Sequence, residues 1–270
     1  MDFRELKSIE YGITHNATFH ADDVFSAAFL KIINPNIKIL RVDTVPNDIK
    51  GIVFDIGFGE FDHHQIDNEV RDNGIPYASF GKLWRKYAPY LYDKEIVENI
   101  DKSFIQNLDL SDNTGSFNEL SYVVQILNPT WGEESNGDKE FDEAVELAII
   151  ILKKLINNEL STLKANKLVM KAYNNSEDKR IIVLDKHYPY KDILVDTEAV
   201  YVIYPSKRGG YAAQGVPIDT NTITLKKDFP KSWVENKPDY IKFIHNSLFI
   251  ITTNTLDEAI KACKKALGDK

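Results

Sequence analysis

Two kinds of apolar pattern alternate along the first part of the chain. Short runs rich in apolar residues have the length and composition of β-strands at Tyr11–Thr14, Lys38–Val42 and Gly51–Asp55. Between the first two runs, Asp22–Ile33 has apolar residues at helical spacing. A strand–helix–strand succession is typical of a parallel sheet with helices packed on its faces. The pattern therefore predicts an N-terminal α/β domain.

The middle of the chain is predicted to be helical. We expect helices over 78–88, 93–108 and 117–127. A polar, turn-rich segment at Trp131–Asp138 is typical of a linker, and a long helical pattern follows from near Phe141 to Tyr173. These features predict a helical connection after the first domain.

A second alternating region occupies the C-terminal part. It predicts strands at Arg180–Leu184, Ala199–Tyr204 and Tyr211–Val216 and a closing helix at Leu256–Leu267. The whole pattern thus predicts an α/β protein with an N-terminal parallel-sheet domain, a helical connection and a smaller C-terminal α/β domain. The predicted division is a metal-binding catalytic domain at 1–130, a linker and connecting helix at 131–175, and a substrate-binding domain at 176–270.

Composition narrows the class of protein. With 43% hydrophobic and 27% charged residues, the 270-residue chain resembles an ordinary globular protein. No apolar run approaches the roughly 20 residues that span a bilayer, and no signal sequence is evident, so we expect a cytoplasmic protein without a membrane partner. The single cysteine, Cys263, excludes an internal disulfide framework and a thiolate metal cluster. A net charge of −8 argues against general coating of nucleic acid, but it is compatible with a nuclease whose carboxylates surround cations.

Histidine and aspartate residues gather where the N-terminal strands are predicted to end. The carboxyl ends of parallel strands form one edge of a sheet, so these side chains are expected in one crevice. Imidazole and carboxylate donors without cysteine suit Mn²⁺, Mg²⁺, Fe²⁺ or Zn²⁺, and the oxygen-rich balance favours Mn²⁺ or Mg²⁺. A carboxylate such as Asp55 can bridge two ions. The candidate residues are His15, His20, Asp22, Asp55, Asp62, His63 and His64.

Each candidate also has an ordinary structural explanation. Asp22 stands where an N-cap would be, because Asp at a helix start accepts from free backbone N–H groups. Asp62 stands where a turn residue would be. A lone histidine at a strand end is more often a capping or core residue than a ligand. Seven such residues placed together after apolar strands nevertheless favour a metal site.

The motifs resemble those of a known family. The triplet Asp62-His63-His64 is similar to the signature of the DHH phosphoesterase superfamily, which includes RecJ-type exonucleases and manganese-dependent inorganic pyrophosphatases. A fuller resemblance is to the melanocyte-proliferating-gene (Myg) family, often described as metal-dependent hydrolases, of which a eukaryotic member is regarded as a 3′–5′ RNA exonuclease. The segments that carry it are 14–23, 61–65 and 75–81, with weaker matches at 108–113, 214–217 and 243–245.

The superfamily resemblance implies a role for each candidate. His15 and His20 would bind one ion, Asp22 and His63 the other, and Asp55 would bridge them. Asp112, or Asp109 as the alternative, would complete the second ion's ligands. His64 would face the scissile phosphate, with Asp62 orienting the triplet. Mn²⁺ is the first expectation. Because many superfamily members have aspartate where His20 stands, Mg²⁺, Fe²⁺ and Zn²⁺ remain open.

Basic residues outside this cluster are candidates for substrate contact. Lys207 and Arg208 precede Gly209-Gly210 and suit either a phosphate or an exposed hairpin, and His245 follows an apolar strand. The family's paired glycines are missing after His245. The basic segment 82–86, which contains Trp84, could bind a nucleic-acid backbone, but its apolar spacing favours an ordinary amphipathic helix.

Three functions remain open at this level. The first is a two-metal phosphodiesterase, 3′–5′ exonuclease-like, acting on RNA or short oligonucleotides, because a cleft between domains suits a strand terminus. The second is a phosphatase or pyrophosphatase for a small phosphate compound, which the acidic net charge favours. The third is a non-catalytic metal-binding or interaction protein.

Overall fold

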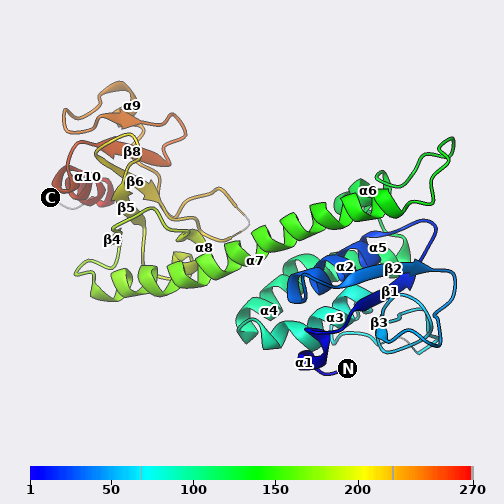
Figure 1. Cartoon of the computed structure of the whole chain (residues 1–270). Helices are drawn as coiled ribbons and strands as arrows, with labels where there is room; N and C mark the ends of the chain where they lie inside the picture. The colour runs from blue at the N-terminus through cyan, green and yellow to red at the C-terminus, as the bar shows by residue number, and fades with distance from the viewer. Residues whose placement is uncertain (68, 221, 269–270) are drawn as a thin grey trace. The chain divides into compact units, whose positions relative to one another are not determined.

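The computed structural model describes residues 1–67, 69–220 and 222–268. The chain forms two compact units, Met1–Leu160 and Ser161–Lys270, and each contains its own sheet (Figure 1). The boundary falls within α7 (Asp138–Asn175), a helix of 38 residues. The predicted α/β fold class is confirmed. No helix among the described residues has the length and apolar character needed to cross a membrane.

The sheet of the first unit is parallel, as the strand–helix–strand pattern predicted. β1 (Tyr11–His15) lies in the centre, with β2 (Lys38–Val42) on one side and β3 (Gly51–Val53) on the other. All three strands therefore end at the same edge, where His15 is the last residue of β1. This edge positions the candidate site.

Helix α2 (Ala21–Ile33) is the core of the first unit. Only Lys31 and Ile32 of its residues are not buried, because the helix is apolar nearly all round and packs on every side. Its neighbours are β1, α3 (Ser79–Tyr87), α5 (Gln106–Thr114) and α6 (Glu119–Gln125). The rings of Phe25 and Phe29 contact the ring of Phe80, so α2 and α3 are held face to face.

Helix α3 is amphipathic, which settles the two interpretations of its basic segment. Trp84 is fully buried, and its Nε1 donates a hydrogen bond to the carbonyl of Val97, so it cannot stack on a base. Lys82 is also buried and donates from Nζ to the carbonyl of Asp62 at 2.6 Å. Arg85 and the neighbouring lysine form ion pairs with surface carboxylates. The segment is a structural helix.

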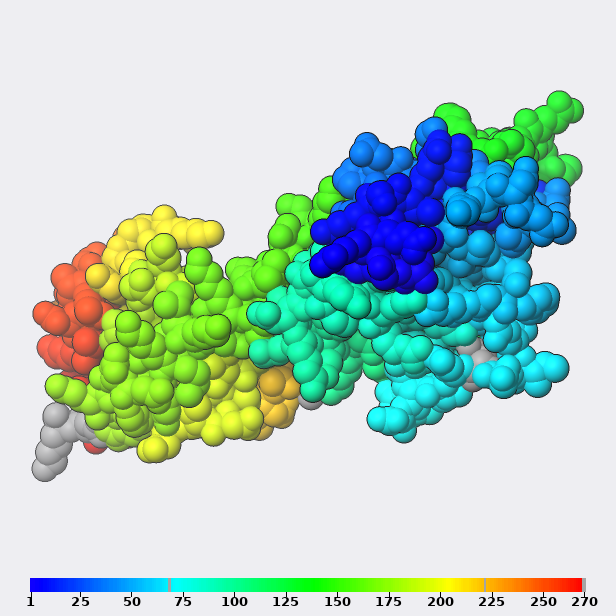
Figure 2. Space-filling view, turned by 60° about the horizontal axis from the view of Figure 1, so that its bottom comes forward, coloured from blue at the N-terminus to red at the C-terminus, as the bar shows by residue number. Residues whose placement is uncertain are grey.

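The helical pattern predicted over 93–108 is three successive elements in the structure. α4 (Lys94–Ile100) continues into the π-helical segment η2 (Asp101–Ile105) and then into α5, which extends beyond the predicted end to Thr114. The N-terminal helix α1 (Phe3–Leu6) lies on the surface of the same unit, where Phe3 stacks on Tyr90 of the 3₁₀ segment η1 (Ala88–Tyr90). In Figure 2 the dark-blue N-terminal part of the chain lies beside the cyan part of the same unit.

The second unit is built on a mixed sheet. Its strands are β4 (Ile181–Val183), β5 (Tyr201–Pro205), β6 (Tyr211–Gly215), β7 (Phe243–Ile244) and β8 (Ile250–Thr253). Their order in the sheet is β4-β5-β6-β8-β7, with β4 and β5 parallel and the other neighbours antiparallel. Helix α10 (Leu256–Leu267) closes one core, and α8 (Lys191–Leu194) belongs to the core of the other face. Strand β8 and the short α9 (Ser232–Glu235) have no counterpart among the predicted elements.

Candidate metal centre

Asp55 is held in an unusual backbone conformation just beyond β3. Its φ is 57°, a left-handed value that side-chain-bearing residues rarely adopt. The backbone N–H of Asp55 donates to the carbonyl of Phe61 at 3.0 Å, which fixes the turn leading to the Asp62-His63-His64 triplet. Such conformations persist where the surrounding structure holds them, and they cluster at functional sites.

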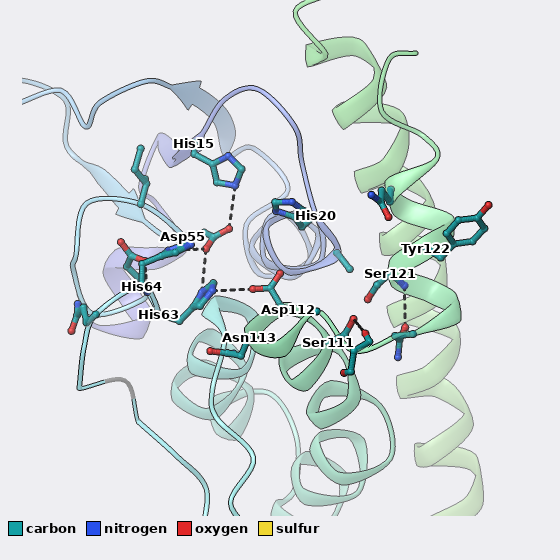
Figure 3. A pocket seen from close by; sticks show the side chains of 18 of the residues that line it. His15, His20, Asp55, His63, His64, Ser111, Asp112, Asn113, Ser121 and Tyr122 are labelled. Carbon is teal, nitrogen blue, oxygen red and sulfur yellow. Dashed lines mark hydrogen bonds and ion pairs between the residues drawn. The ribbon is translucent and has the colours of Figure 1, made fainter. Parts of the chain in front are cut away.

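The two carboxylate oxygens of Asp55 face two different histidines. Oδ2 lies 3.2 Å from Nε2 of His15, and Oδ1 lies 3.2 Å from Nδ1 of His63 (Figure 3). The Asp55 side chain is only 3% exposed. A buried carboxylate whose oxygens diverge in this way has the geometry expected of a residue that bridges two cations.

The first cluster, on the Oδ2 side, consists of His15, Asp23 and Asp55. Nδ1 of His15 lies 2.7 Å from the carbonyl of Asn16, so the proton belongs on Nδ1 and Nε2 is directed at the carboxylates. Oδ1 of Asp23 accepts the amides of His20 and Val24 at 2.8 and 3.0 Å. Its other oxygen lies 3.5 Å from Nε2 of His15 and is buried without a hydrogen-bond partner among the described residues.

The second cluster consists of Asp22, His63 and Asp112. Oδ2 of Asp22 lies 3.7 Å from Nδ1 of His63, and Nε2 of His63 lies 2.9 Å from Oδ2 of Asp112. Asp22 is not the N-cap of its own helix, because His20 occupies that position. Its oxygens instead accept the amides of Ser79 and Phe80, at 2.9 and 2.7 Å, at the N-terminus of α3. Asp22 thus satisfies the free N–H groups of a different helix.

The structure separates the two candidate aspartates of α5. Asp112 reaches His63 and lines the cavity beside the clusters. Asp109 is fully buried, and its Oδ2 accepts a hydrogen bond from Nη2 of Arg71 at 2.7 Å. Arg71 also pairs with Asp101 of η2. Geometry therefore groups Asp112 with the candidate ligands and Asp109 with a structural ion pair.

Within the triplet, Asp62 positions His64. Oδ1 of Asp62 lies 2.7 Å from Nδ1 of His64 and accepts its backbone N–H at 3.1 Å, while Oδ2 accepts the backbone N–H of Phe58 at 2.7 Å. The His64 side chain is 56% exposed and lines the cavity. Because Nδ1 is engaged by Asp62, Nε2 is the nitrogen that remains for a ligand in the cavity.

His20 lines the same cavity without joining the carboxylate clusters. Its ring centroid lies 6.0 Å from that of His15. Two side chains that the sequence did not single out fix the loop between these histidines. The side chain of Arg41 is buried and donates a hydrogen bond to the carbonyl of Ala17. Ala17 has a left-handed φ of 63°. The Asn128 amide donates to the carbonyl of Phe19 and accepts its N–H, both at 2.9 Å.

The clusters are electrostatically crowded without cations. Burial opposes protonation of His15, but its contacts with Asp55 and Asp23 outweigh burial and raise its pKa to about 9. Burial likewise opposes protonation of His63, whereas Asp112 and Asp55 raise its pKa to about 11. Burial raises the pKa of Asp23 to about 7. Without metal, the two imidazolium groups therefore supply positive charge among the carboxylates.

The acidic residues respond to the same crowding. Burial, followed by the charges of Asp55 and Asp112, raises the pKa of Asp22. For Asp55, burial acts in the raising direction, but contacts with His15 and His63 outweigh it and hold the pKa below its ordinary value. Buried imidazole and carboxylate donors, and an oxygen of Asp23 without a partner, fit divalent cations. The chain's own residues therefore fit the metal predicted from the sequence.

A cavity of about 1020 Å³ opens beside the clusters. One wall carries His15, Asp55 and the triplet, and the other is formed by the C-terminal end of α5, the α5–α6 connection and α6. Figure 3 shows His64 on the first wall and Ser121 and Tyr122 of α6 across from it. The described lining residues all belong to the first unit.

The predicted substrate residues of the second unit lie outside this cavity lining. Lys207 and Arg208 are exposed in the turn that joins β5 to β6, where Gly209 and Gly210 have φ values of 86° and 69°. The segment is thus an exposed hairpin turn, which was one of its two interpretations from the sequence. A phosphate contact there stays a prediction.

His245 follows β7, and its Nδ1 accepts the backbone N–H of Ser247 at 3.0 Å. It too lies outside the described cavity lining. Where the family's glycines are missing, Leu248 has a left-handed φ of 58°. The chain thus makes a tight turn at this point without glycine, and a role of His245 toward substrate stays a prediction.

Sheet, clusters and cavity together define an α/β protein with a candidate centre for divalent metal. The chain belongs to the MYG1 exonuclease family, described as Uncharacterised protein family (UPF0160), whose model matches residues 12–267. The resemblance to the Myg family is therefore confirmed, and membership of the DHH superfamily stays a prediction.

Relatives from distant organisms match nearly the whole chain. It is similar to a MYG1 protein of Schizosaccharomyces pombe, with 25% identity over 94% of this chain and 96% of the relative. It is also similar to the MYG1 exonuclease of Rattus norvegicus, with 26% identity over 95% of this chain and 84% of the relative. A MYG1 protein of Chlamydia pneumoniae is 23% identical over 95% of this chain and 96% of its own length.

Proposed function

We propose that this protein is a metal-dependent phosphodiesterase, 3′–5′ exonuclease-like, that acts on RNA or short oligonucleotides. The observation that carries the proposal is the divergence of the two Asp55 oxygens, at 3.2 Å from one histidine of each cluster. Relatives named exonucleases support the same reaction class. The cation expected first is Mn²⁺, because the donors are imidazoles and carboxylates without thiolate.

Two ion positions follow from the clusters. His15 and Asp55 would hold the first ion, with His20 on the cavity side and Asp23 supplying its unpartnered oxygen. The second position would be held by Asp22, His63 and Asp112, with Asp55 shared between the two.

Bound divalent cations supply an activated water and stabilise the leaving oxygen in phosphoryl transfer. The protein's own contribution is positioning. The amides at the start of α3 hold Asp22. Asp62 fixes Nδ1 of His64 and thereby directs Nε2 at the phosphate. The Oγ of Ser79 donates to Oδ1 of Asp55 at 3.3 Å and restrains the shared carboxylate.

The test offers Mn²⁺-loaded protein three substrates in parallel: labelled single-stranded RNA, a DNA oligonucleotide of the same sequence, and pyrophosphate. We expect release of nucleotides from an oligonucleotide end. His64→Ala should keep most of the bound metal and lose most of the rate, because Nδ1 of His64 is engaged by Asp62 at 2.7 Å and lies 3.8 Å from the shared Asp55. Metal-loaded protein that hydrolyses none of the three substrates would refute the proposal and favour the non-catalytic metal-binding function.

The acidic net charge of −8 is the observation that favours a second candidate, a phosphatase or pyrophosphatase for a small phosphate compound. Release of orthophosphate from pyrophosphate, with oligonucleotides left intact, would establish this candidate in place of the first.

A further inference from the structure

The wall of the cavity across from the triplet is aromatic. Phe117 and Tyr122 are 76% and 54% exposed, and their ring centroids lie 6.3 Å apart at an interplanar angle of 44°. Both line the cavity. Figure 3 shows Tyr122 on α6, with its ring directed away from His64. Large aromatic rings usually contribute to a core, so two exposed rings that contact each other at a cavity suggest a ligand with an apolar face.

A third exposed aromatic residue lies on the triplet side. Phe58 is 73% exposed and has a left-handed φ of 57°, a conformation that is unfavourable for a bulky side chain. Burial of its ring does not compensate for this strain. Two contacts hold the backbone in place: Asp62 accepts the N–H of Phe58, and Nε2 of Gln65 donates to its carbonyl at 2.6 Å. The residues that shape the triplet thus also present this ring to the cavity.

Apart from the carboxylate of Asp112, the polar side chains of the aromatic wall are neutral. No Lys or Arg is present in the lining of the cavity as far as the chain is described. The wall instead carries amides and hydroxyls, from Asn113, Asn118, Ser121 and Gln125. A polyphosphate would call for cationic side chains in addition to the metal centre, because charge-assisted contacts bind phosphate oxygens best. Neutral amides beside aromatic faces suit the edge and face of a nucleobase.

We propose that Phe117 and Tyr122, with Phe58 on the side of the triplet, form a stacking site for the base of the nucleotide whose phosphate lies at the metal centre. This inference rests on the proposed function and deepens it, because it assigns the non-ionic part of the substrate to named residues. Stacking on aromatic rings tolerates any base, so the site selects for a base without selecting a sequence.

The experiment compares an intact RNA oligonucleotide with the same oligonucleotide lacking the base of each terminal nucleotide. Equilibrium binding is measured without Mn²⁺, so that the strand stays intact, and hydrolysis is measured with Mn²⁺. Stacking on one aromatic site is worth about 5- to 150-fold in affinity. The unmodified protein should prefer the intact strand by about tenfold or more, and Phe117→Leu and Tyr122→Leu should each remove most of that preference, chiefly through Kd and KM.

Two control variants accompany these changes. Tyr122→Phe keeps the ring and should keep the preference. Ile126→Ala removes an apolar side chain that is 60% exposed at the end of α6 outside the cavity lining, and should change nothing. Affinity for the strand without terminal bases and the bound Mn²⁺ should be unchanged in all four variants.

The outcomes separate this inference from the proposed function. Equal binding of the two strands by the unmodified protein would overturn the stacking site. Equal losses on both strands in the leucine variants would also overturn it, and would place the aromatic pair in the fold or in a protein interface. A clear base preference in binding without any hydrolysis would leave the stacking site standing and refute the phosphodiesterase.

Discussion

Asp55→Asn tests the shared carboxylate directly, because it keeps the shape of the side chain and removes its charge. In the metal-free protein at pH 6, the substitution removes two charge-assisted contacts, each 3.2 Å long, from a side chain that is 3% exposed. Contacts of this kind contribute about 1.5–3 kcal/mol each. Since the amide can still accept one hydrogen bond, we expect a loss of about 2–4 kcal/mol in the free energy of unfolding.

The effect on metal should be larger than the effect on the fold. Loss of partners beyond the direct ligands already costs about 10–100-fold in affinity or activity. Removing a carboxylate shared by two ions should therefore lower occupancy at both positions and reduce turnover by about 10³-fold or more. Bound Mn²⁺ is measured by elemental analysis after equilibrium dialysis, stability by urea unfolding of the metal-free protein, and rate with labelled RNA.

Glu60→Gln is the matched control for Asp55→Asn. Glu60 forms an exposed ion pair with Lys86 at 2.7 Å, and its side chain is 56% exposed. The same chemical change there should cost less than about 1 kcal/mol and leave metal and rate unchanged. Retention of two ions and near-normal turnover by Asp55→Asn would refute the assignment, and the shared ligand would then have to be another residue.

Three further predictions concern pH, packing and the second unit. The pKa values of His15 and His63 are raised to about 9 and about 11 in the folded, metal-free protein. The protonated histidines therefore stabilise this fold fully below pH 6.5, and the stabilisation is lost as the pH rises through the two raised pKa values. Because Mn²⁺ needs the neutral imidazoles, its affinity and its effect on Tm should increase from pH 6 to pH 9; a pH-independent effect would exclude these histidines as ligands. Gly81→Ala would place Cβ 2.0 Å from Oδ2 of Asp109, so it should destabilise by about 1–3 kcal/mol in thermal unfolding, whereas Gly132→Ala, with open space around it, should be neutral. Arg208→Ala should slow hydrolysis of RNA without changing bound Mn²⁺, and unchanged kinetics would assign Arg208 to the solvated hairpin.

Local pattern was enough to predict the elements that carry the site. The parallel arrangement of β1, β2 and β3 follows from strand–helix–strand spacing, and it places His15 and Asp55 at one edge before any coordinates are known. The apolar spacing of α3 favoured an amphipathic helix, and the burial of Trp84 in the structure excludes the alternative of nucleic-acid contact. These predictions succeed because periodicity and strand order are properties of short segments.

Residues whose roles depend on distant partners could not be predicted in this way. Asp22 stands where a helix cap is common, yet its oxygens bind amides 57 and 58 positions further along the chain. Asp23, its neighbour, gave no separate signal, although its side chain faces His15. Asp109 and Asp112 lie one turn apart on α5, and only the position of Arg71 shows which carboxylate is committed to the fold.

Helix α3 links these long-range contacts to the metal centre. Its first amides hold Asp22, the lack of a side chain at Gly81 lets Asp109 approach the helix, and Nζ of Lys82 donates to the carbonyl of Asp62. One helix therefore positions a carboxylate of the second cluster and the residue that orients His64. Since α3 also packs its aromatic face on α2, the alignment of the centre depends on the same packing that stabilises the first unit. Changes in the α2–α3 core should for this reason affect metal affinity as well as stability.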